Sequence, residues 1–237
     1  NLLGINIQPS EIMKIFLILA LAKFFDERKM ENFKEYFFLL IPIFLIILPF
    51  SIIITQPDLG TSVVLLSLGI VVFFVAGINF RFFIFCFLIF LISSPLLWNS
   101  LHQYQRQRLL TFFDPYKDPL GAGYHIIQSE IAIGSGGFLG KGWLKGTQSH
   151  LDFLPEKKTD FIFSMLGEEF GFLGTISVIG LFILIYITGY MISNSIEKSF
   201  FSKVVGISII TNFFLSGTIN MAMVMGLTPV VGIPLPL

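Results

Sequence analysis

Charged residues are scarce in this chain: only 13% of its 237 residues are Asp, Glu, Lys or Arg, whereas 54% are hydrophobic. Such a composition suits a surface that faces lipid far better than one that faces water. The formal net charge is zero, and no run of lysine and arginine interleaved with aromatic residues occurs. The sequence therefore gives no sign of a basic nucleic-acid surface, and we expect no nucleic-acid partner.

Cysteine is nearly absent as well. The single cysteine, Cys86, lies in an apolar run, where we expect it to pack as a small hydrophobic residue. No spacing of histidines and carboxylates indicates a metal site, so the sequence requires no cofactor. A divalent cation that bridges a pyrophosphate and loop carboxylates is an open alternative.

The two ends of the chain lack the marks of natural termini. The sequence begins at Asn1 rather than at a methionine and stops inside a Gly-Ile-Pro-Leu-Pro-Leu run, so we expect it to be part of a longer protein. Residues 1–9 have neither the basic region nor the cleavage site of a signal peptide. We therefore expect the membrane spans themselves to direct targeting.

Long apolar runs are the feature that this chain has in abundance. A bilayer core of about 30 Å takes roughly 20 helical residues per crossing. The runs predict six transmembrane helices, at residues 10–25, 36–54, 59–77, 80–98, 171–191 and 204–227. The apolar stretch 161–192 is too long for one upright crossing, so its first turns should rise above the membrane. We predict an all-α, polytopic integral membrane protein that forms a single domain over residues 1–237.

The distribution of charge orients these helices. With six crossings, segments 26–35, 78–80 and 192–203 share one side, and 55–58 and 99–160 share the other. The first side, counting the residue that flanks 78–80, carries Arg28, Lys29, Lys34, Arg81, Lys198 and Lys203. The positive-inside rule makes that side cytoplasmic. Residues 99–160 therefore form one large extracytoplasmic loop.

This long loop concentrates glycine, proline and charge, and loops of its length are usually functional. Residues 131–143 contain five glycines beside Lys141 and Lys145, so backbone amides could approach a pyrophosphate. The alternative is that the glycines only permit tight turns at the membrane surface. Trp98 and Trp143 are typical of interfacial aromatic anchors.

Several acidic residues lie beside the apolar runs. Asp160 precedes an apolar helix, where the simplest reading of an isolated aspartate is an N-cap. Asp58 either faces a substrate cavity or caps the helix that begins at Leu59, and its local chemistry favours capping.

Two further pairs of charged residues lie within apolar runs, where charge needs a cavity or a partner. Glu168 and Glu169 point to different helix faces. At least one of them should face a substrate cavity, while the other snorkels or pairs with a basic loop residue; which one does so stays open. Glu11 and Lys14, spaced i, i+3, should form an ion pair within the bundle or anchor the membrane edge.

The motifs of the chain resemble the SEDS (shape, elongation, division, sporulation) family of membrane proteins. The resemblance covers essentially the whole chain and rests on residues 8–11, 56–61, 104–108, 114–115, 118–119, 123–129, 132–137, 146–148, 154–163 and 229–236. The sequence motifs of the loop are more similar to those of the RodA branch than to those of the division branch, FtsW. Compared with the ten helices of the family, the first few and the last are absent.

The resemblance implies a glycosyltransferase that polymerises lipid II into peptidoglycan strands during cell elongation and rod-shape maintenance. It places the protein in the bacterial cytoplasmic (inner) membrane, crossing it several times, with a class B penicillin-binding transpeptidase of the elongation machinery as partner. By its match to the family's Thr-Asp-Phe motif, Asp160 would be the general base. Candidate pyrophosphate-binding residues are Arg106, Arg108, Lys141, Lys157 and Lys158. Their alternative role is contact with anionic lipid headgroups.

Two other functions compete with this reading. A transporter or flippase of a lipid-linked cell-wall precursor is compatible with Glu11, Lys14 and Asn220 inside apolar runs. A transporter, however, should carry its site near the bilayer midplane, whereas the charges of this chain concentrate at the outer surface. A scaffold that only positions a transpeptidase would make the carboxylates dispensable. The enzyme is therefore the preferred hypothesis.

Overall fold

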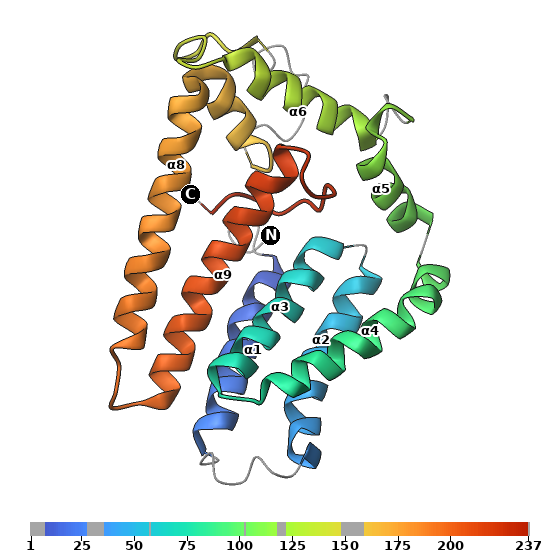
Figure 1. Ribbon diagram of the computed structural model, residues 1–237, viewed down its shortest axis with the longest axis vertical. Helices are drawn as coiled ribbons and strands as arrows, with labels where there is room; N and C mark the ends of the chain where they lie inside the picture. The colour runs from blue at the N-terminus through green and yellow to red at the C-terminus, as the bar shows by residue number, and fades with distance from the viewer. Residues whose placement is uncertain are drawn as a thin grey trace. The chain divides into compact units, whose positions relative to one another are not determined.

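The computed structural model describes residues 8–27, 36–56, 58–101, 103–117, 122–147 and 159–236. Across these residues all regular structure is helical, and none of it is a strand (Figure 1). The elements are α1 (Pro9–Glu27), the 3-10 helix η2 (Tyr36–Leu39), α2 (Leu40–Thr55), α3 (Leu59–Val75), α4 (Phe80–Ser100), α5 (Gln103–Phe113), the 3-10 helix η3 (Pro115–Lys117), α6 (Ala122–Gly136), α8 (Ile162–Asn194) and α9 (Phe200–Val224). The predicted all-α class is confirmed.

All six segments predicted to span a membrane are helical. Their ends differ by at most four residues from the expected ones, except that α8 begins nine residues earlier, at Ile162. In the described part of the chain, α8 and α9 are the two helices long and apolar enough to cross a membrane by length and composition. Shorter apolar helices cover Leu40–Thr55, Leu59–Val75 and Phe80–Leu96. The long apolar stretch that was expected to exceed one crossing is the 33-residue helix α8.

The segment 99–160, which we predicted as one large extracytoplasmic loop, has regular structure of its own. It contains α5, η3 and α6, and α6 includes residues 131–136 of the glycine-rich run. Gly136 packs closely against Gly167 of α8, because a Cβ on Gly136 would overlap the Gly167 carbonyl oxygen. Glycine is needed at this last residue of α6 to let two backbones approach.

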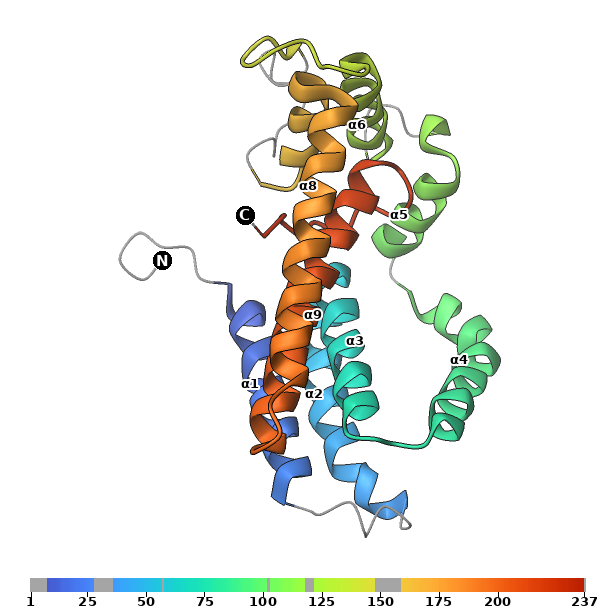
Figure 2. The same ribbon diagram turned by 60° about the vertical axis from the view of Figure 1, so that its left-hand side comes forward.

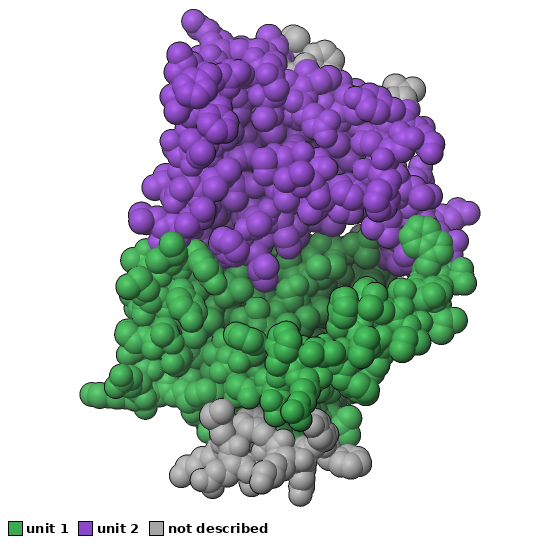
Figure 3. Space-filling view, in the orientation of Figure 1, with its two compact units in different colours: residues 1–100, 186–212 green, residues 101–185, 213–237 purple. Residues whose placement is uncertain are grey.

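The chain divides into two compact units, which Figure 3 shows in different colours. Unit 1 comprises residues 1–100 and 186–212, and unit 2 comprises residues 101–185 and 213–237. In unit 1, α1, α2 and α3 lie side by side (Figures 1 and 2). Their core includes Leu21, Phe25, Leu65 and Val72, and Val204 of α9 joins it. Apolar burial therefore holds this unit together.

Unit 2 has a core of its own around the start of α8. Its buried residues are Phe161, Phe163, Phe182, Met221, Met223, Val224 and Leu235. Phe182 of α8 stacks on Phe213 of α9 with ring centroids 4.9 Å apart. The segment after α9, which contains Leu235, thus returns to the side chains that begin α8.

Helix α8 is broken at Gly171, whose φ of 64° and ψ of −157° are not helical. A break leaves the carbonyls before it without their usual N–H partners. The carbonyls of Glu168 and Glu169 instead accept hydrogen bonds of 3.0 Å from the backbone N–H groups of Lys141 and Gly142. The turn that follows α6 therefore supplies hydrogen-bond donors to the last carbonyls of the first half of the broken helix.

The same turn also supplies hydrogen-bond acceptors to the first N–H groups of the second half. The N–H groups of Phe172 and Leu173 donate to the carbonyls of Gly137 and Phe138, at 2.9 and 3.2 Å. Gly140 makes this close approach possible, because a Cβ there would overlap the Glu169 carbonyl oxygen. Buried main-chain N–H and carbonyl groups are nearly always hydrogen-bonded in native proteins. The 137–142 turn supplies those groups at the break in α8.

Candidate active site

Asp160, the predicted general base, lies in the turn before α8 and is half-buried. Helix α8 begins at Ile162, so Phe161 rather than Asp160 occupies the N-cap position. The carboxylate lies beside Gly232 of the segment after α9, because a Cβ on Gly232 would be 3.6 Å from Asp160 Oδ2. Two segments far apart in sequence therefore meet at this side chain.

The main chain at Asp160 is held by Asn220 of α9. The Nδ2 group of Asn220 donates to the Asp160 carbonyl at 2.8 Å and to the Ile233 carbonyl at 2.7 Å. Sequence reasoning noted Asn220 only as compatible with transport. An asparagine within an apolar span was the available signal, since polar groups at that depth need specific partners.

A chain of hydroxyl groups links three helical segments nearby. Ser129 Oγ of α6 lies 2.6 Å from the Val224 carbonyl and 2.7 Å from Ser164 Oγ of α8. A carbonyl oxygen only accepts, so the single hydroxyl hydrogen of Ser129 goes to Val224 and Ser164 donates to Ser129. Both serines are fully buried. The start of α8 is thereby fixed to α6 and to the end of α9.

His125 of α6 lies next to the same turn. Its ring packs on that of Phe161, with centroids 5.9 Å apart. Phe161 follows Asp160 directly in the sequence. An aromatic contact therefore adds to the hydrogen bonds that fix the start of α8.

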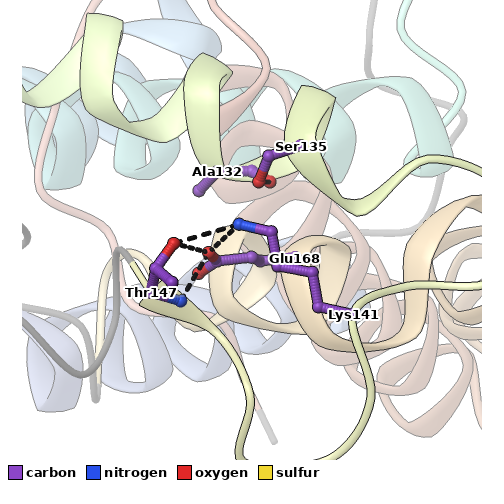
Figure 4. Close-up of polar contacts among 5 residues, drawn as sticks. All are labelled: Ala132, Ser135, Lys141, Thr147 and Glu168. Carbon is purple, nitrogen blue, oxygen red and sulfur yellow. Dashed lines mark hydrogen bonds and ion pairs between the residues drawn. The ribbon is translucent and has the colours of Figure 1, made fainter.

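Glu168 forms a buried ion pair with Lys141 (Figure 4). Its carboxylate is 0% exposed, and Oε1 lies 2.7 Å from Lys141 Nζ. The same oxygen accepts from Thr147 N at 2.7 Å and from Thr147 Oγ1 at 3.0 Å. Of the two glutamates, Glu168 is thus the one that pairs with a basic loop residue. It fixes residues 141–147 on α8.

The remaining predicted residues of unit 2 are placed as follows. Glu169 is buried, and its main-chain carbonyl accepts from Gly142 N–H. Arg106 and Arg108 lie half-buried on α5. Lys157 and Lys158 lie outside the described residues.

The amides of the glycine-rich run are already bonded within the protein. The N–H groups of Gly140, Lys141 and Gly142 donate to the carbonyls of Gly136, Glu168 and Glu169. Gly137, Gly140 and Gly142 have positive φ values of 57°, 81° and 103°. The structure therefore supports the tight-turn alternative for these glycines over an amide cradle for pyrophosphate.

The other predicted charged residues belong to unit 1. Lys14, only 2% exposed, pairs with Glu11, 47% exposed, at 2.7 Å, which confirms the expected ion pair. Asp58 Oδ1 accepts from Thr61 N–H at 3.0 Å, so Asp58 caps α3 as its local chemistry indicated. Its other oxygen accepts from Gln8 Nε2 at 3.1 Å and thereby ties the start of α1 to that of α3.

The described residues show no sign of a metal site built from protein ligands alone. They contain no group of three or more His, Cys, Asp and Glu side chains that could hold an ion. Sites that use the oxygens of a bound pyrophosphate need fewer protein ligands. The bridging cation therefore stays an untested alternative.

Comparison with known proteins identifies the family. The family model FTSW_RODA_SPOVE, described as "Cell cycle protein", matches residues 1–237. The chain belongs to the FtsW/RodA/SpoVE family. Its structure resembles that of a chain in a peptidoglycan synthase complex studied for the structural coordination of polymerization and crosslinking, with a TM-score of 0.81 and 28% identity. That match covers 98% of this chain and 64% of the other. The resemblance to the SEDS family is thus confirmed, and the chain is a polytopic α-helical membrane protein.

Curated relatives support the same assignment. The chain is 43% identical to peptidoglycan glycosyltransferase MrdB of Escherichia coli K12 over 98% of its own length and 62% of that protein. It is 39% identical to stage V sporulation protein E of Bacillus subtilis, with 98% and 62% covered. It is 36% identical to a probable peptidoglycan glycosyltransferase FtsW of Geobacter, with 98% and 63% covered. Identity is thus higher with MrdB, the RodA-type relative, than with this FtsW. The chain spans about three-fifths of the length of these relatives.

Proposed function

We propose that the protein to which this chain belongs polymerises lipid II into peptidoglycan strands at the outer face of the bacterial cytoplasmic membrane, which it crosses several times. The observation that carries the proposal is the placement of Asp160 directly before α8, with its carboxylate beside Gly232 and its main chain held by Asn220. A catalytic carboxylate needs such support, because a base acts only from within hydrogen-bond reach of its proton. Membership of a family that includes named peptidoglycan glycosyltransferases supports the reaction class.

The proposed step is a glycosyl transfer. Asp160 takes the proton of the acceptor sugar 4-hydroxyl as the oxygen attacks the anomeric carbon of the donor. The new glycosidic bond forms while the bond between the anomeric carbon and the lipid pyrophosphate breaks. The pyrophosphate leaves with both electrons of that bond, and cationic side chains stabilise the charge that develops on it.

We assign the leaving-group contacts first to Arg106 and Arg108, since guanidinium groups can bind phosphate oxygens through two hydrogen bonds. Lys157 and Lys158 keep the same proposed role by resemblance. Lys141 is held by buried Glu168 and serves the fold in our proposal, as Glu168 does. Glu169 stays the candidate acidic residue for a substrate cavity. A divalent cation that bridges the pyrophosphate is compatible with this scheme.

The proposed biological setting is cell elongation and rod-shape maintenance, with a class B penicillin-binding transpeptidase as partner. Two observations support it. MrdB is the relative with 43% identity, and the structure resembles a chain of a complex that coordinates polymerization with crosslinking.

The test is Asp160→Asn in the purified full-length protein, supplied with lipid II. We expect strand synthesis to fall by about 10²–10⁴-fold, because the amide cannot accept the hydroxyl proton as a carboxylate does. Gel analysis of the glycan products measures the rate. Asp26→Asn is the matched control. The Asp26 side chain accepts the N–H of Phe201 through Oδ1, and the amide oxygen of asparagine can accept the same bond.

The outcomes separate the three functions. Normal polymerisation by the Asp160→Asn protein contradicts the assignment of the base. Movement of labelled lipid II across proteoliposomes without strand synthesis favours the transporter. A wild-type protein that does neither, yet stimulates a transpeptidase, favours the scaffold.

A further inference from the structure

Asn220 is a fully buried amide in α9, one of the two described helices that are long and apolar enough to span a membrane. Both hydrogens of its Nδ2 group are used, one by the Asp160 carbonyl and one by the Ile233 carbonyl. Carbonyl oxygens only accept, so the orientation of the amide is fixed by its partners. One side chain therefore joins three segments: α9, the turn before α8, and the segment after α9.

The two carbonyls belong to segments that meet a second time at the carboxylate. Gly232, the neighbour of Ile233, has a φ of +68° and lies beside Asp160 Oδ2. The distance between the Asp160 side chain and this segment is thus set by the amide that binds both main chains. Moving either carbonyl away from Asn220 would move the carboxylate relative to Gly232.

The two donors of Asn220 satisfy main-chain carbonyls, which stabilises the fold, but its acceptor gains nothing from the site. Asn220 Oδ1 is buried and has no hydrogen-bond partner among the described residues. A buried acceptor without a partner is unfavourable, and such groups call for an explanation. Leucine has nearly the same size and would remove that acceptor together with the two donors. The presence of an amide is explained if the reaction needs both of its N–H donors at the Asp160 and Ile233 carbonyls.

We propose that Asn220 is a positioning residue for the reaction, which holds the Asp160 main chain and the 232–233 main chain in the register that aims the carboxylate at the acceptor hydroxyl. The inference rests on the proposed function, in which Asp160 is the base. Positioning requires two N–H donors on a short stem. Aspartate would place an oxygen against two carbonyls, and glutamine carries the same two donors on a stem one methylene longer.

The experiment compares Asn220→Leu, Asn220→Asp and Asn220→Gln in the full-length protein, with lipid II as substrate. We expect the leucine and aspartate variants to lose about 10²-fold in kcat, the size of effect that a shift of about 1 Å can cause. The KM for lipid II should stay within about twofold, because Asn220 does not contact the substrate in this proposal. The glutamine variant should recover about tenfold of the loss, since it restores both donors.

Asn212→Leu is the matched control, because Asn212 lies on the same helix and also has a buried Oδ1 without a partner among the described residues. It should keep the wild-type kcat. Rates are normalised to monodisperse protein, and melting temperatures are recorded in the same detergent. A structural role alone would lower the melting temperature and the yield of Asn220→Leu without changing kcat per folded molecule.

Several results would overturn the inference. One is a wild-type kcat for monodisperse Asn220→Leu. If that variant does not stay monodisperse, the kcat values of the other two variants decide the test. Equal kcat values for Asn220→Gln and Asn220→Asp would reject the positioning role. Asp160→Asn is measured in parallel to separate the two proposals. An inactive Asp160→Asn with an active Asn220→Leu rejects the inference alone, whereas an active Asp160→Asn rejects the base and the positioning role together.

Discussion

Each of the two units of this protein is stabilised internally by a different kind of contact. In unit 1, rings and aliphatic side chains pack between helices, as where Phe25 meets Phe73 edge-on at 5.7 Å. Several of its serine hydroxyls bond within their own helices, as Ser62 does to the Leu59 carbonyl. Polar contacts between distant segments of unit 1, such as that of Asp26 with the Phe201 N–H, are exposed. In unit 2, a buried side chain such as Ser129 binds the Val224 carbonyl, 95 residues away.

The difference follows from the backbone of each unit. The helices α1, α2 and α3 satisfy their own N–H and carbonyl groups, so apolar packing is sufficient between them. Unit 2 contains a broken helix at Gly171 and an extended segment after α9, which leave main-chain groups without helical partners. Side-chain donors and the 137–142 turn bind those groups. The unit with the irregular backbone is also the one that contains the candidate base.

The largest expected effect contrasts two tightly packed glycines. At Gly140 of unit 2, an alanine Cβ would overlap the Glu169 carbonyl oxygen and lie 2.6 Å from Phe170 Cα, at a φ of +81°. At Gly69 of unit 1, it would meet only side-chain atoms of Ile46, with Cδ1 at 2.6 Å and Cγ1 at 2.8 Å. We expect Gly140→Ala to lower the free energy of unfolding by about 4 kcal/mol, from backbone overlap and strain together.

Gly69→Ala should lower that free energy by only about 1–2 kcal/mol, because the Ile46 side chain must shift but no backbone atom is in the way, and alanine favours the helix. Unfolding of purified protein by SDS in mixed micelles measures both. Equal losses for the two variants would show that unit 2 is no more dependent on backbone contact than unit 1.

A smaller effect contrasts the two ion pairs. In unit 2 the anion is buried: Lys141→Met would remove the paired cation from Glu168, whose side chain is 0% exposed. We expect a loss of about 3 kcal/mol, since a buried charge without its counter-ion is strongly unfavourable.

In unit 1 the cation is the buried partner, and Lys14→Met leaves only the half-exposed Glu11. Its loss should stay below about 1 kcal/mol. The same SDS titration provides the measurement. The comparison fails if Lys14→Met is the more destabilised protein of the two.

The smallest effect contrasts two buried serines. Ser129→Ala deprives the Val224 carbonyl and the Ser164 hydroxyl of a partner, and we expect a loss of about 1–2 kcal/mol. Ser62→Ala should change stability by less than about 0.5 kcal/mol, because a carbonyl inside a helix keeps its backbone partner. Melting temperatures in one detergent compare the two. Indistinguishable melting temperatures would show that the hydroxyl chain does not stabilise unit 2.

The sequence predicted well wherever a signal was local. Six apolar runs of suitable length correspond to helices in the structure, and the i, i+3 spacing of Glu11 and Lys14 predicted their ion pair. For 99–160 the sequence predicted a large loop but not the helices α5 and α6 that lie within it. Glycine indicated a turn in each case, but at Gly136 it serves a close contact with Gly167, which only the folded chain reveals.

By itself, the sequence determined the helical class, the family and the choice of Asp160 as candidate base, because apolar runs and motifs are written in consecutive residues. Only the tertiary structure decided that Glu168 pairs with Lys141, 27 residues away, and that Asn220 binds the Asp160 carbonyl, 60 residues away. Hydrogen bonds and ion pairs reach about 3 Å, so which groups meet depends on how the helices pack. No local pattern of residues contains that information.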